Sequence, residues 1–242
     1  MILFFSGTGN SKFVAKQLAE LLHENLHNME CGNTPHLEEG EPIGIVFPVY
    51  AWGLPQIVES YLRKMDVSGR YLWAVMTCGD DMGYADKRLE KALQHKVNAA
   101  FSVQMPNTYV CLPGFKVDSD EVAQRKVNTT QERLSEIAGH IQKKEGCRQL
   151  TRGGAAWMKT YMLRPVFNRF LVTDKYFRTS KDCNACGLCA KQCPTHNISL
   201  CSHTPMWNRT DCTGCLRCFH KCPQRAIDWG KYTKGKKQVQ KV

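Results

Sequence analysis

The chain has 242 residues, thirteen cysteines and a formal net charge of +11. That length allows one large domain or two ordinary ones. No apolar run approaches the ~20 residues of a membrane-spanning helix, and the N-terminal residues lack the basic region of a secretory signal peptide. We therefore expect a cytoplasmic protein without a transmembrane segment, in which disulfides play no part.

A loop rich in glycine and hydroxyl groups follows the first apolar segment, a strand expected at 2–5, and a helix follows the loop. This arrangement presents backbone N–H groups to a phosphate at the N-terminus of the helix. The loop matches neither GxxxxGK[ST] nor GxGxxG, because Lys12 stands where the latter needs its third glycine. The candidate phosphate-binding residues are Ser6, Gly7, Thr8, Gly9, Asn10 and Ser11.

Two later strands, expected at 44–47 and 71–76, end in loops that carry aromatic residues and glycine. Alternating strands and helices predict right-handed crossovers and a parallel sheet covered on both faces, with ligands bound beyond the carboxyl ends of the strands. Trp52 and Tyr84 are candidates to stack on a planar ligand, while backbone groups contact its polar edge. The candidate residues of these loops are Pro48, Tyr50, Ala51, Trp52, Gly53, Thr77, Cys78, Gly79, Asp80 and Tyr84.

The loop at 6–11 resembles the S/T-x-T-G-N-S/T loop by which flavodoxins hold the phosphate of FMN, and Gly79-Asp80-x3-Tyr84 is similar to a second flavodoxin element. The resemblance implies FMN binding and an α/β fold with a five-stranded, doubly wound parallel sheet of order 2-1-3-4-5. For the remaining elements we expect a second strand at 27–31, a fifth strand at 99–105 and a closing helix at 122–144, with residues 105–109 near the flavin.

The segment 146–181 joins the N-terminal part to a cysteine-rich part. It interleaves aromatic and basic residues, namely Trp157, Tyr161, Phe167 and Phe170 with Lys159, Arg164 and Arg169. Because Pro165 interrupts an α-helix, we expect two short helices or a kink. The aromatic side chains are expected to bury the seam between the two parts; the alternative is a basic amphipathic segment lying on an anionic membrane.

Eight cysteines form two copies of one pattern, each with C-x2-C-x2-C-x3-C-P spacing. The copies are Cys183, Cys186, Cys189 and Cys193, and Cys212, Cys215, Cys218 and Cys222. Each iron of a [4Fe–4S] cluster takes one thiolate, and in this pattern the fourth cysteine belongs to the other cluster. We therefore assign Cys183, Cys186, Cys189 and Cys222 to one cluster, and Cys212, Cys215, Cys218 and Cys193 to the other.

Zinc sites and disulfides are the alternatives to iron–sulfur clusters. Structural zinc usually shows pairs of CxxC with a longer spacer and no fourth Cys-Pro. This part of the sequence resembles a bacterial two-cluster ferredoxin, which implies a small α+β domain with two [4Fe–4S] clusters.

Positive charge is concentrated in the second part of the chain: residues 1–150 carry a net charge of −2 and residues 151–242 one of +13. A positively charged surface favours a protein redox partner whose docking surface is acidic. Nucleic acid is the alternative partner, but no nucleic-acid-binding motif accompanies the charge. We expect no nucleic-acid partner, and the sequence does not fix an oligomeric state.

The whole chain resembles the fusions of a flavodoxin-like domain to a bacterial ferredoxin known as EFR-family ferredoxins. We expect an FMN-binding domain over 1–146, a connector over 147–180, a two-cluster domain over 181–230 and a basic tail over 231–242. The resemblance implies electron transfer. Our hypothesis is an oxidoreductase that couples FMN to two [4Fe–4S] clusters and has no catalytic side chain of its own.

Two alternatives to that hypothesis remain. In one, the protein is an electron carrier whose flavodoxin-like domain only docks a redox partner. In the other, it is a zinc-stabilised nucleic-acid-binding protein built on the basic C-terminal part.

Overall fold

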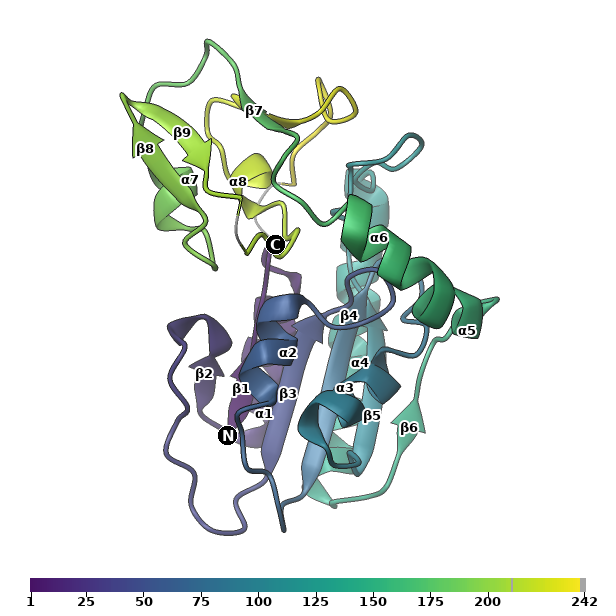
Figure 1. Ribbon diagram of the computed structural model, residues 1–242. Helices are drawn as coiled ribbons and strands as arrows, with labels where there is room; N and C mark the ends of the chain where they lie inside the picture. Colours follow the sequence, from purple (N-terminus) through teal and green to yellow (C-terminus); the bar gives the residue numbers. More distant parts are fainter. Residues whose placement is uncertain (210, 240–242) are drawn as a thin grey trace.

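A six-stranded parallel sheet forms the centre of the N-terminal part in the computed structural model, which describes residues 1–209 and 211–239. The strand order is β2-β1-β3-β4-β5-β6 (Figure 1). The strands are β1 (Ile2–Phe4), β2 (Leu26–Asn28), β3 (Ile43–Pro48), β4 (Leu72–Cys78), β5 (Ala99–Gln104) and β6 (Arg148–Gln149). The helices between them are α1 (Asn10–Leu22), α2 (Gln56–Leu62), α3 (Ala85–Leu93) and α4 (Asp120–Gln142).

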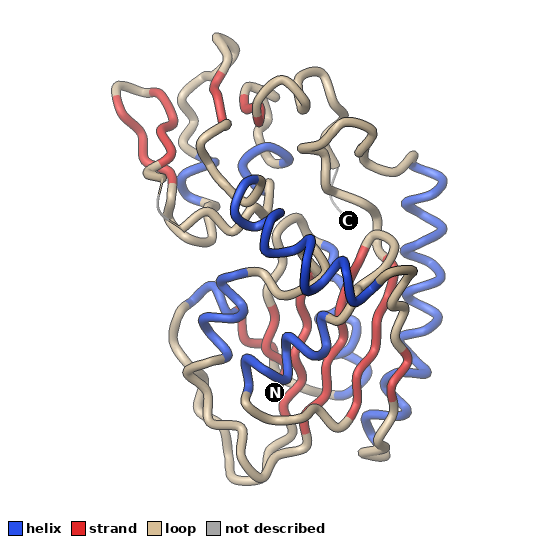
Figure 2. Tube along the Cα trace, turned by 45° about the vertical axis from the view of Figure 1, so that its right-hand side comes forward, coloured by secondary structure: helices blue, strands red, loops and turns tan. Residues whose placement is uncertain are grey.

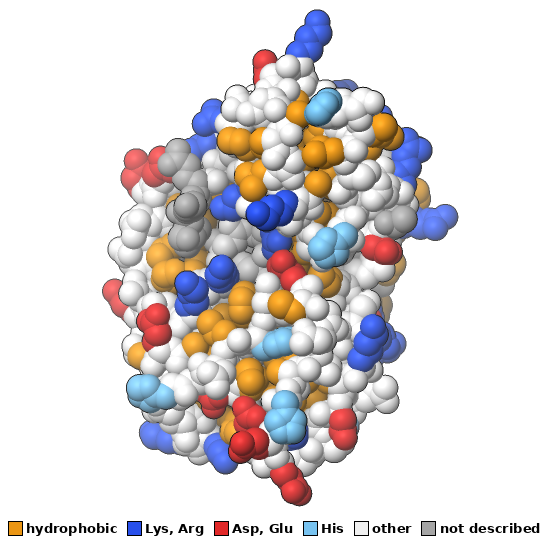
Figure 3. All heavy atoms as spheres, turned by 90° about the vertical axis from the view of Figure 1, so that its left-hand side faces the viewer, with side chains coloured by type: hydrophobic (Ala, Val, Ile, Leu, Met, Phe, Trp, Pro, Cys, Tyr) orange, Lys and Arg blue, Asp and Glu red, His pale blue; other side chains and the backbone are white. Residues whose placement is uncertain are grey.

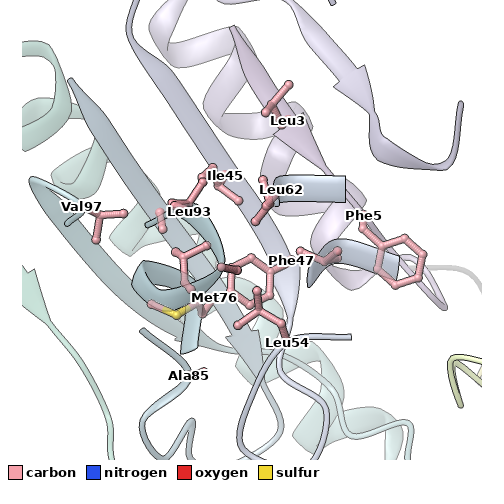
Figure 4. Close-up of a cluster of buried hydrophobic side chains, with 14 of the residues drawn as sticks. Leu3, Phe5, Ile45, Phe47, Leu54, Leu62, Met76, Ala85, Leu93 and Val97 are labelled. Carbon is pink, nitrogen blue, oxygen red and sulfur yellow. The ribbon is translucent and has the colours of Figure 1, made fainter. Parts of the chain in front are cut away.

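Both faces of the sheet are buried. Successive side chains of a strand point to opposite sides, so each strand contributes apolar side chains to both faces. Leu3 packs into a core with α2 and α3, shown in Figure 4, whereas its neighbour Ile2 packs into a second core with α1 and α4. Helices therefore cover both sides of the sheet, as Figure 2 shows. The predicted α/β class is confirmed, and so is the order of the first five strands.

The sequence-based expectations differ from the structure at two strands. β6 was not predicted, because Arg148 and Gln149 have no apolar pattern; this strand extends the sheet beyond five members by pairing with Ala100 and Phe101 of β5. β2 begins one residue before the expected 27–31 segment and gives way at Met29 to a 3₁₀ turn, η1 (Met29–Cys31). Because β2 is a half-exposed edge strand, its apolar signal is weak.

The C-terminal part is built from short elements around the cysteine loops. β7 (Phe177–Thr179) pairs antiparallel with β10 (Ile227–Trp229), and β8 (Ile198–Cys201) pairs antiparallel with β9 (Thr204–Trp207). A short helix follows the first cysteines of each repeat, α7 (Leu188–Lys191) and α8 (Arg217–His220).

A third apolar core crosses from one part of the chain to the other. Val110 and Cys111, from the loop after β5, are buried with Phe177, Phe219 and Trp229 of the C-terminal part. The buried ring of His220 adds a polar link, with Nε2 2.8 Å from the carbonyl oxygen of Thr108. The two parts therefore share buried surface instead of meeting only through the connector.

The connector is helical without a break from α5 (Ala156–Met158) through a π-helical segment, η2 (Lys159–Leu163), to α6 (Arg164–Phe170). Pro165 lies inside this continuous helix, where its ring and its missing N–H disrupt the regular α-helical hydrogen bonds, and the wider π turn directly precedes it. The proline therefore produces a local π segment between α5 and α6.

The expectation that all the connector aromatics bury the seam is wrong. Phe167 is half-buried, with its ring 5.6 Å from that of Tyr109. Trp157, Tyr161 and Phe170 are 60%, 41% and 64% exposed. The inward face of the helix is instead anchored by polar side chains, Thr160 and Arg164. Among the described residues, every helix is too short or too polar to cross a membrane.

Arg164 is the main anchor of the connector on the sheet. Its guanidinium donates hydrogen bonds to the carbonyl oxygens of Tyr50, Ala51 (3.2 Å) and Leu54 (2.6 Å). Burial lowers the pKa of this side chain to about 10, which leaves it charged at neutral pH. The buried guanidinium of Arg164 thus holds the loop after β3 in place through hydrogen bonds to three of its carbonyl groups.

We predict that Arg164→Met lowers the free energy of unfolding by about 3 kcal/mol, because three carbonyl groups lose a charged donor in a buried place. Urea denaturation of the purified protein measures this change. The matched control, Arg169→Met, alters an exposed arginine of the same helix and should cost less than about 0.5 kcal/mol. Equal losses in the two variants would contradict the anchoring role.

Candidate functional site

A cavity of about 370 Å³ lies beyond the carboxyl ends of β1, β3 and β4, where a parallel sheet of this kind binds its ligand. The three loops singled out from the sequence meet there. The predicted residues that line the cavity are Ser6, Gly7, Thr8, Asn10, Ser11, Pro48, Tyr50, Ala51, Trp52, Thr77, Cys78, Gly79 and Asp80. Pro106, Asn107, Thr108 and Tyr109 from the loop after β5 line it as well, whereas Met105 does not.

Three predicted residues do not line this cavity. Gly9 faces the outer side of the loop. Gly53 bridges back to Tyr50, and a Cβ on it would lie 2.6 Å from the guanidinium carbon of Arg164. Tyr84 points away from the cavity: the guanidinium of Arg152 lies 4.2 Å above its ring.

The N-terminus of α1 is open toward the cavity. Its N-cap is Gly9 with φ of 133°, and no side chain of the described residues caps the helix. The hydroxyl groups of Ser11 and Thr77 lie 2.8 Å apart in a buried position, which ties the first turn of α1 to the end of β4. Uncapped N–H groups at a helix N-terminus suit an anion.

Asn10 contributes a polar group that has no partner of its own. Its side-chain N–H donates to the carbonyl oxygen of Pro106 at 2.8 Å, while its Oδ1 is buried and accepts no hydrogen bond from the part of the chain that the structure describes. A buried acceptor of this kind is costly unless a ligand satisfies it. A ligand hydroxyl group would do so.

The aromatic and thiol groups of the cavity are held by neighbours. Trp52 meets the ring of Phe167 edge-on at 6.5 Å and has the Lys159 ammonium 5.7 Å from its ring centre. Lys159 in turn forms an ion pair of 2.7 Å with Asp81. Burial raises the pKa of the Cys78 thiol to about 12, so this thiol is protonated at neutral pH.

The wall opposite the sheet comes from residues far away in the chain, which the sequence analysis did not associate with this site. The connector supplies Lys159, Phe167, Leu171, Val172 and Thr173, and the cysteine-rich part supplies Phe177, Thr213, Gly214, Cys215, Leu216 and Trp229. Lys159, Phe167 and Cys215 belong to patterns noted above, but no local pattern places any of these residues at the cavity, because they reach it only through the packing of the two parts. The cavity therefore lies between the sheet and one cysteine loop.

Gly7 is the point of closest approach between the phosphate loop and that cysteine loop. A Cβ on Gly7 would lie 2.2 Å from Tyr50 Oη, 3.1 Å from Cys215 Cβ and 3.2 Å from the Cys215 carbonyl oxygen. Burial raises the pKa of Tyr50 well above its usual value, and the Cys215 thiol raises it further, so the hydroxyl is neutral. Glycine at position 7 is thus required by the contact between the two parts.

Arg217 stabilises this contact through hydrogen bonds and an ion pair. Its Nε donates to the carbonyl oxygen of Gly7 at 2.8 Å and its Nη2 to that of Ser6 at 2.6 Å. Its Nη1 donates to the Glu30 carboxylate at 2.9 Å, and the same nitrogen donates to the Gln192 carbonyl oxygen at 2.8 Å. One guanidinium therefore joins the phosphate loop, the η1 turn and both cysteine repeats.

The cysteines of the two repeats gather in two interleaved sets. Cys183, Cys186, Cys189 and Cys222 line one small cavity, whereas Cys193, Cys212, Cys215 and Cys218 line another. Burial raises the pKa of Cys218 well above its usual value, and the thiols of Cys215, Cys212 and Cys193 raise it further. Burial likewise raises the pKa of Cys212 to about 12 and that of Cys215 to about 11. Among residues 1–209 and 211–239, no three His, Cys, Asp or Glu side chains lie at a spacing suited to a single metal ion.

Comparison with known proteins gives two family matches. Residues 1–111 match the family described as a flavodoxin domain, and residues 205–228 match the family described as a 4Fe-4S binding domain. A search of curated proteins gives no match.

Solved structures similar to this chain include a flavodoxin from Streptococcus pneumonia TIGR4, with 15% identity over 59% of this chain and 97% of that one, and a TM-score of 0.39. A putative flavoprotein from Bacteroides uniformis ATCC 8492 shows 17% identity over 53% and 96% of the two chains, with a TM-score of 0.38. An FMN-dependent NADH-azoreductase from Bacillus anthracis str. Ames Ancestor, in complex with FMN, shows 12% identity over 57% and 97%, with a TM-score of 0.33.

The two family matches fall on the two parts of the chain that meet at the cavity. Together they support an electron-transfer role that uses flavin and iron–sulfur groups. The chain therefore carries a flavodoxin domain at its N-terminal end and a 4Fe-4S binding domain toward its C-terminal end.

Proposed function

We propose that this protein is an electron-transfer oxidoreductase that couples FMN to two [4Fe–4S] clusters and exchanges electrons with a protein partner whose docking surface is acidic. The observation that carries the proposal is the shared cavity: Cys215 and Leu216 form part of the same walls as the phosphate loop and Trp52. When bound, FMN takes up or releases one or two electrons, and each cluster exchanges one.

The cavity suits FMN in size and chemistry. Its volume of about 370 Å³ falls within the range of cofactor sites. Ser6, Thr8 and the uncapped N-terminus of α1 offer donors to a phosphate, and Asn10 Oδ1 offers a buried acceptor to a hydroxyl group of the sugar-alcohol chain. Trp52 offers a flat surface to the flavin ring.

The two thiol sets suit two clusters of four irons. Each set has four cysteines, and each takes three from one repeat and the fourth from the other. The buried thiols are protonated at neutral pH, so iron has to displace their protons when it binds. The extent of cluster assembly should therefore rise with pH. Arg217 and Tyr50 lie beside Cys215, and the hydrogen bond from Arg217 to Gly7 holds the Cys215 loop against the phosphate loop at the edge of the cavity.

We predict that Gly9→Val lowers the FMN content of the purified protein at least about tenfold, because a φ of 133° is open to glycine and strained for valine. Iron content should stay the same, since the cysteine loops are untouched. Released flavin and bound iron are measured on the same anaerobic preparation.

Gly69→Val is the matched control for that variant. Gly69 also has a positive φ, 71°, and open space around it, but it lies away from the cavity. Its FMN content should equal that of the wild type. Full retention of FMN in Gly9→Val would overturn the phosphate-loop assignment.

Double substitutions test the interleaved thiol sets. The Cys193→Ser/Cys212→Ser variant damages one set only and should keep about four of about eight irons. The Cys183→Ser/Cys193→Ser variant damages both sets and should keep almost none, although both of its cysteines belong to one repeat. Iron and sulfide analysis measures the outcome, and a reversal of the two results would show that each repeat binds its own cluster.

A further inference from the structure

A second, larger cleft opens on the outer side of the phosphate loop. It has a volume of about 720 Å³ and lies between α1 of the flavodoxin domain and α8 of the cysteine-rich part. Figure 3 looks onto this side of the molecule, where Lys and Arg side chains gather at mid-height between the two parts. The cleft shares Ser6, Gly7 and Thr8 with the flavin cavity but otherwise has its own lining.

The lining carries a surplus of positive charge from both sides. Lys12 and Lys16 lie one turn apart on α1, are exposed, and form no ion pair with any described residue. Lys221 and Arg217 come from the cysteine-rich part. Glu30 is the sole acidic residue among the described lining residues, and its carboxylate is already paired with Arg217.

The cleft lies beside the chain segments that hold the thiol set of Cys193, Cys212, Cys215 and Cys218. Gln192 of the lining directly precedes Cys193, and Arg217 stands between Cys215 and Cys218. Lys221 directly precedes Cys222 of the other set. A molecule seated in the cleft therefore contacts residues that are next to cysteines of both sets in the sequence.

We propose that this cleft docks the carboxylate-rich surface of a one-electron redox protein. Charge complementarity argues for an acidic occupant: residues 151–242 carry a net charge of +13, which two bound clusters of net charge −2 each lower to about +9, and this charge would steer such a protein toward this end of the molecule. A second copy of this chain is disfavoured, because it would bring the same cations together. The inference rests on the proposed electron-transfer function and adds to it the place where the partner binds.

The test compares two double variants that change the charge equally. Lys12→Glu/Lys16→Glu reverses the charge of the cleft without touching Arg217 or a cysteine. Lys143→Glu/Lys144→Glu makes the same change after the end of α4, in the segment that leads into β6 near the amino end of β4, away from the phosphate loop and the cleft. FMN and iron are measured in the wild type and in both variants. Missing cofactors in the wild type would show that the proposed function fails, whereas intact cofactors with lost binding would concern docking alone.

Binding is measured by calorimetric titration with poly-L-glutamate at low and high ionic strength. Electron exchange is measured by stopped-flow mixing with a purified acidic ferredoxin. We expect Lys12→Glu/Lys16→Glu to weaken both binding and the second-order rate constant at least about tenfold at low salt, and the control to change either by less than about threefold. Equal loss in the two variants, or no binding by the wild type, would overturn the proposal. Pyrophosphate is titrated in parallel: binding that depends on Lys12 and Lys16, without binding of poly-L-glutamate, would identify a site for small anions and would also overturn it.

Discussion

The contact between Gly7 and Cys215 determines how the two parts of the chain are arranged. A side chain at position 7 would meet Tyr50 and Cys215, so the loops can approach this closely only with glycine there. Arg217 bonds both loops through the carbonyl groups of Gly7, Ser6 and Gln192 and is neutralised by Glu30. Separating the parts would break the Arg217–Glu30 ion pair and the hydrogen bonds from Arg217 to Gly7 and Ser6, all of which cross the contact.

The rest of the molecule supports this contact from two directions. Below it, the sheet is buried on both faces, so the carboxyl ends of β1, β3 and β4 form a rigid floor. Beside it, the connector helix is fixed by Arg164 to the loop after β3 and contributes Phe167 to the cavity wall. The core around Val110, Phe177 and Trp229 then closes the third side. A cavity walled in this way can shield a ligand from water while a thiol loop stays in contact with it.

Features that depend on local sequence could be predicted, whereas features that depend on distant packing could not. The apolar strands at 2–4, 43–48 and 72–78 and the spacing of the cysteines are local signals, and the phosphate loop lies where the strand–loop–helix pattern indicates. β6 has two polar residues and exists because α4 returns the chain beside β5. Tyr84 was expected at the binding site, but the guanidinium of Arg152 covers its ring. The connector aromatics were expected at the seam between the two parts, but Trp157 and Phe170 are exposed. The spacing of its repeat marks Cys215 as a cluster ligand, but no local signal shows that Cys215 and Leu216 form a wall of this cavity, since that wall arises from the docking of the two parts.

The most direct test of the shared cavity is a crystal structure of the anaerobically purified protein, with anomalous scattering measured at the iron edge. The account predicts flavin density between Trp52 and Leu216, and two iron peaks of which the one bonded to Cys193, Cys212, Cys215 and Cys218 lies nearer the flavin. Flavin bound elsewhere, or no iron beside Cys215, would contradict it.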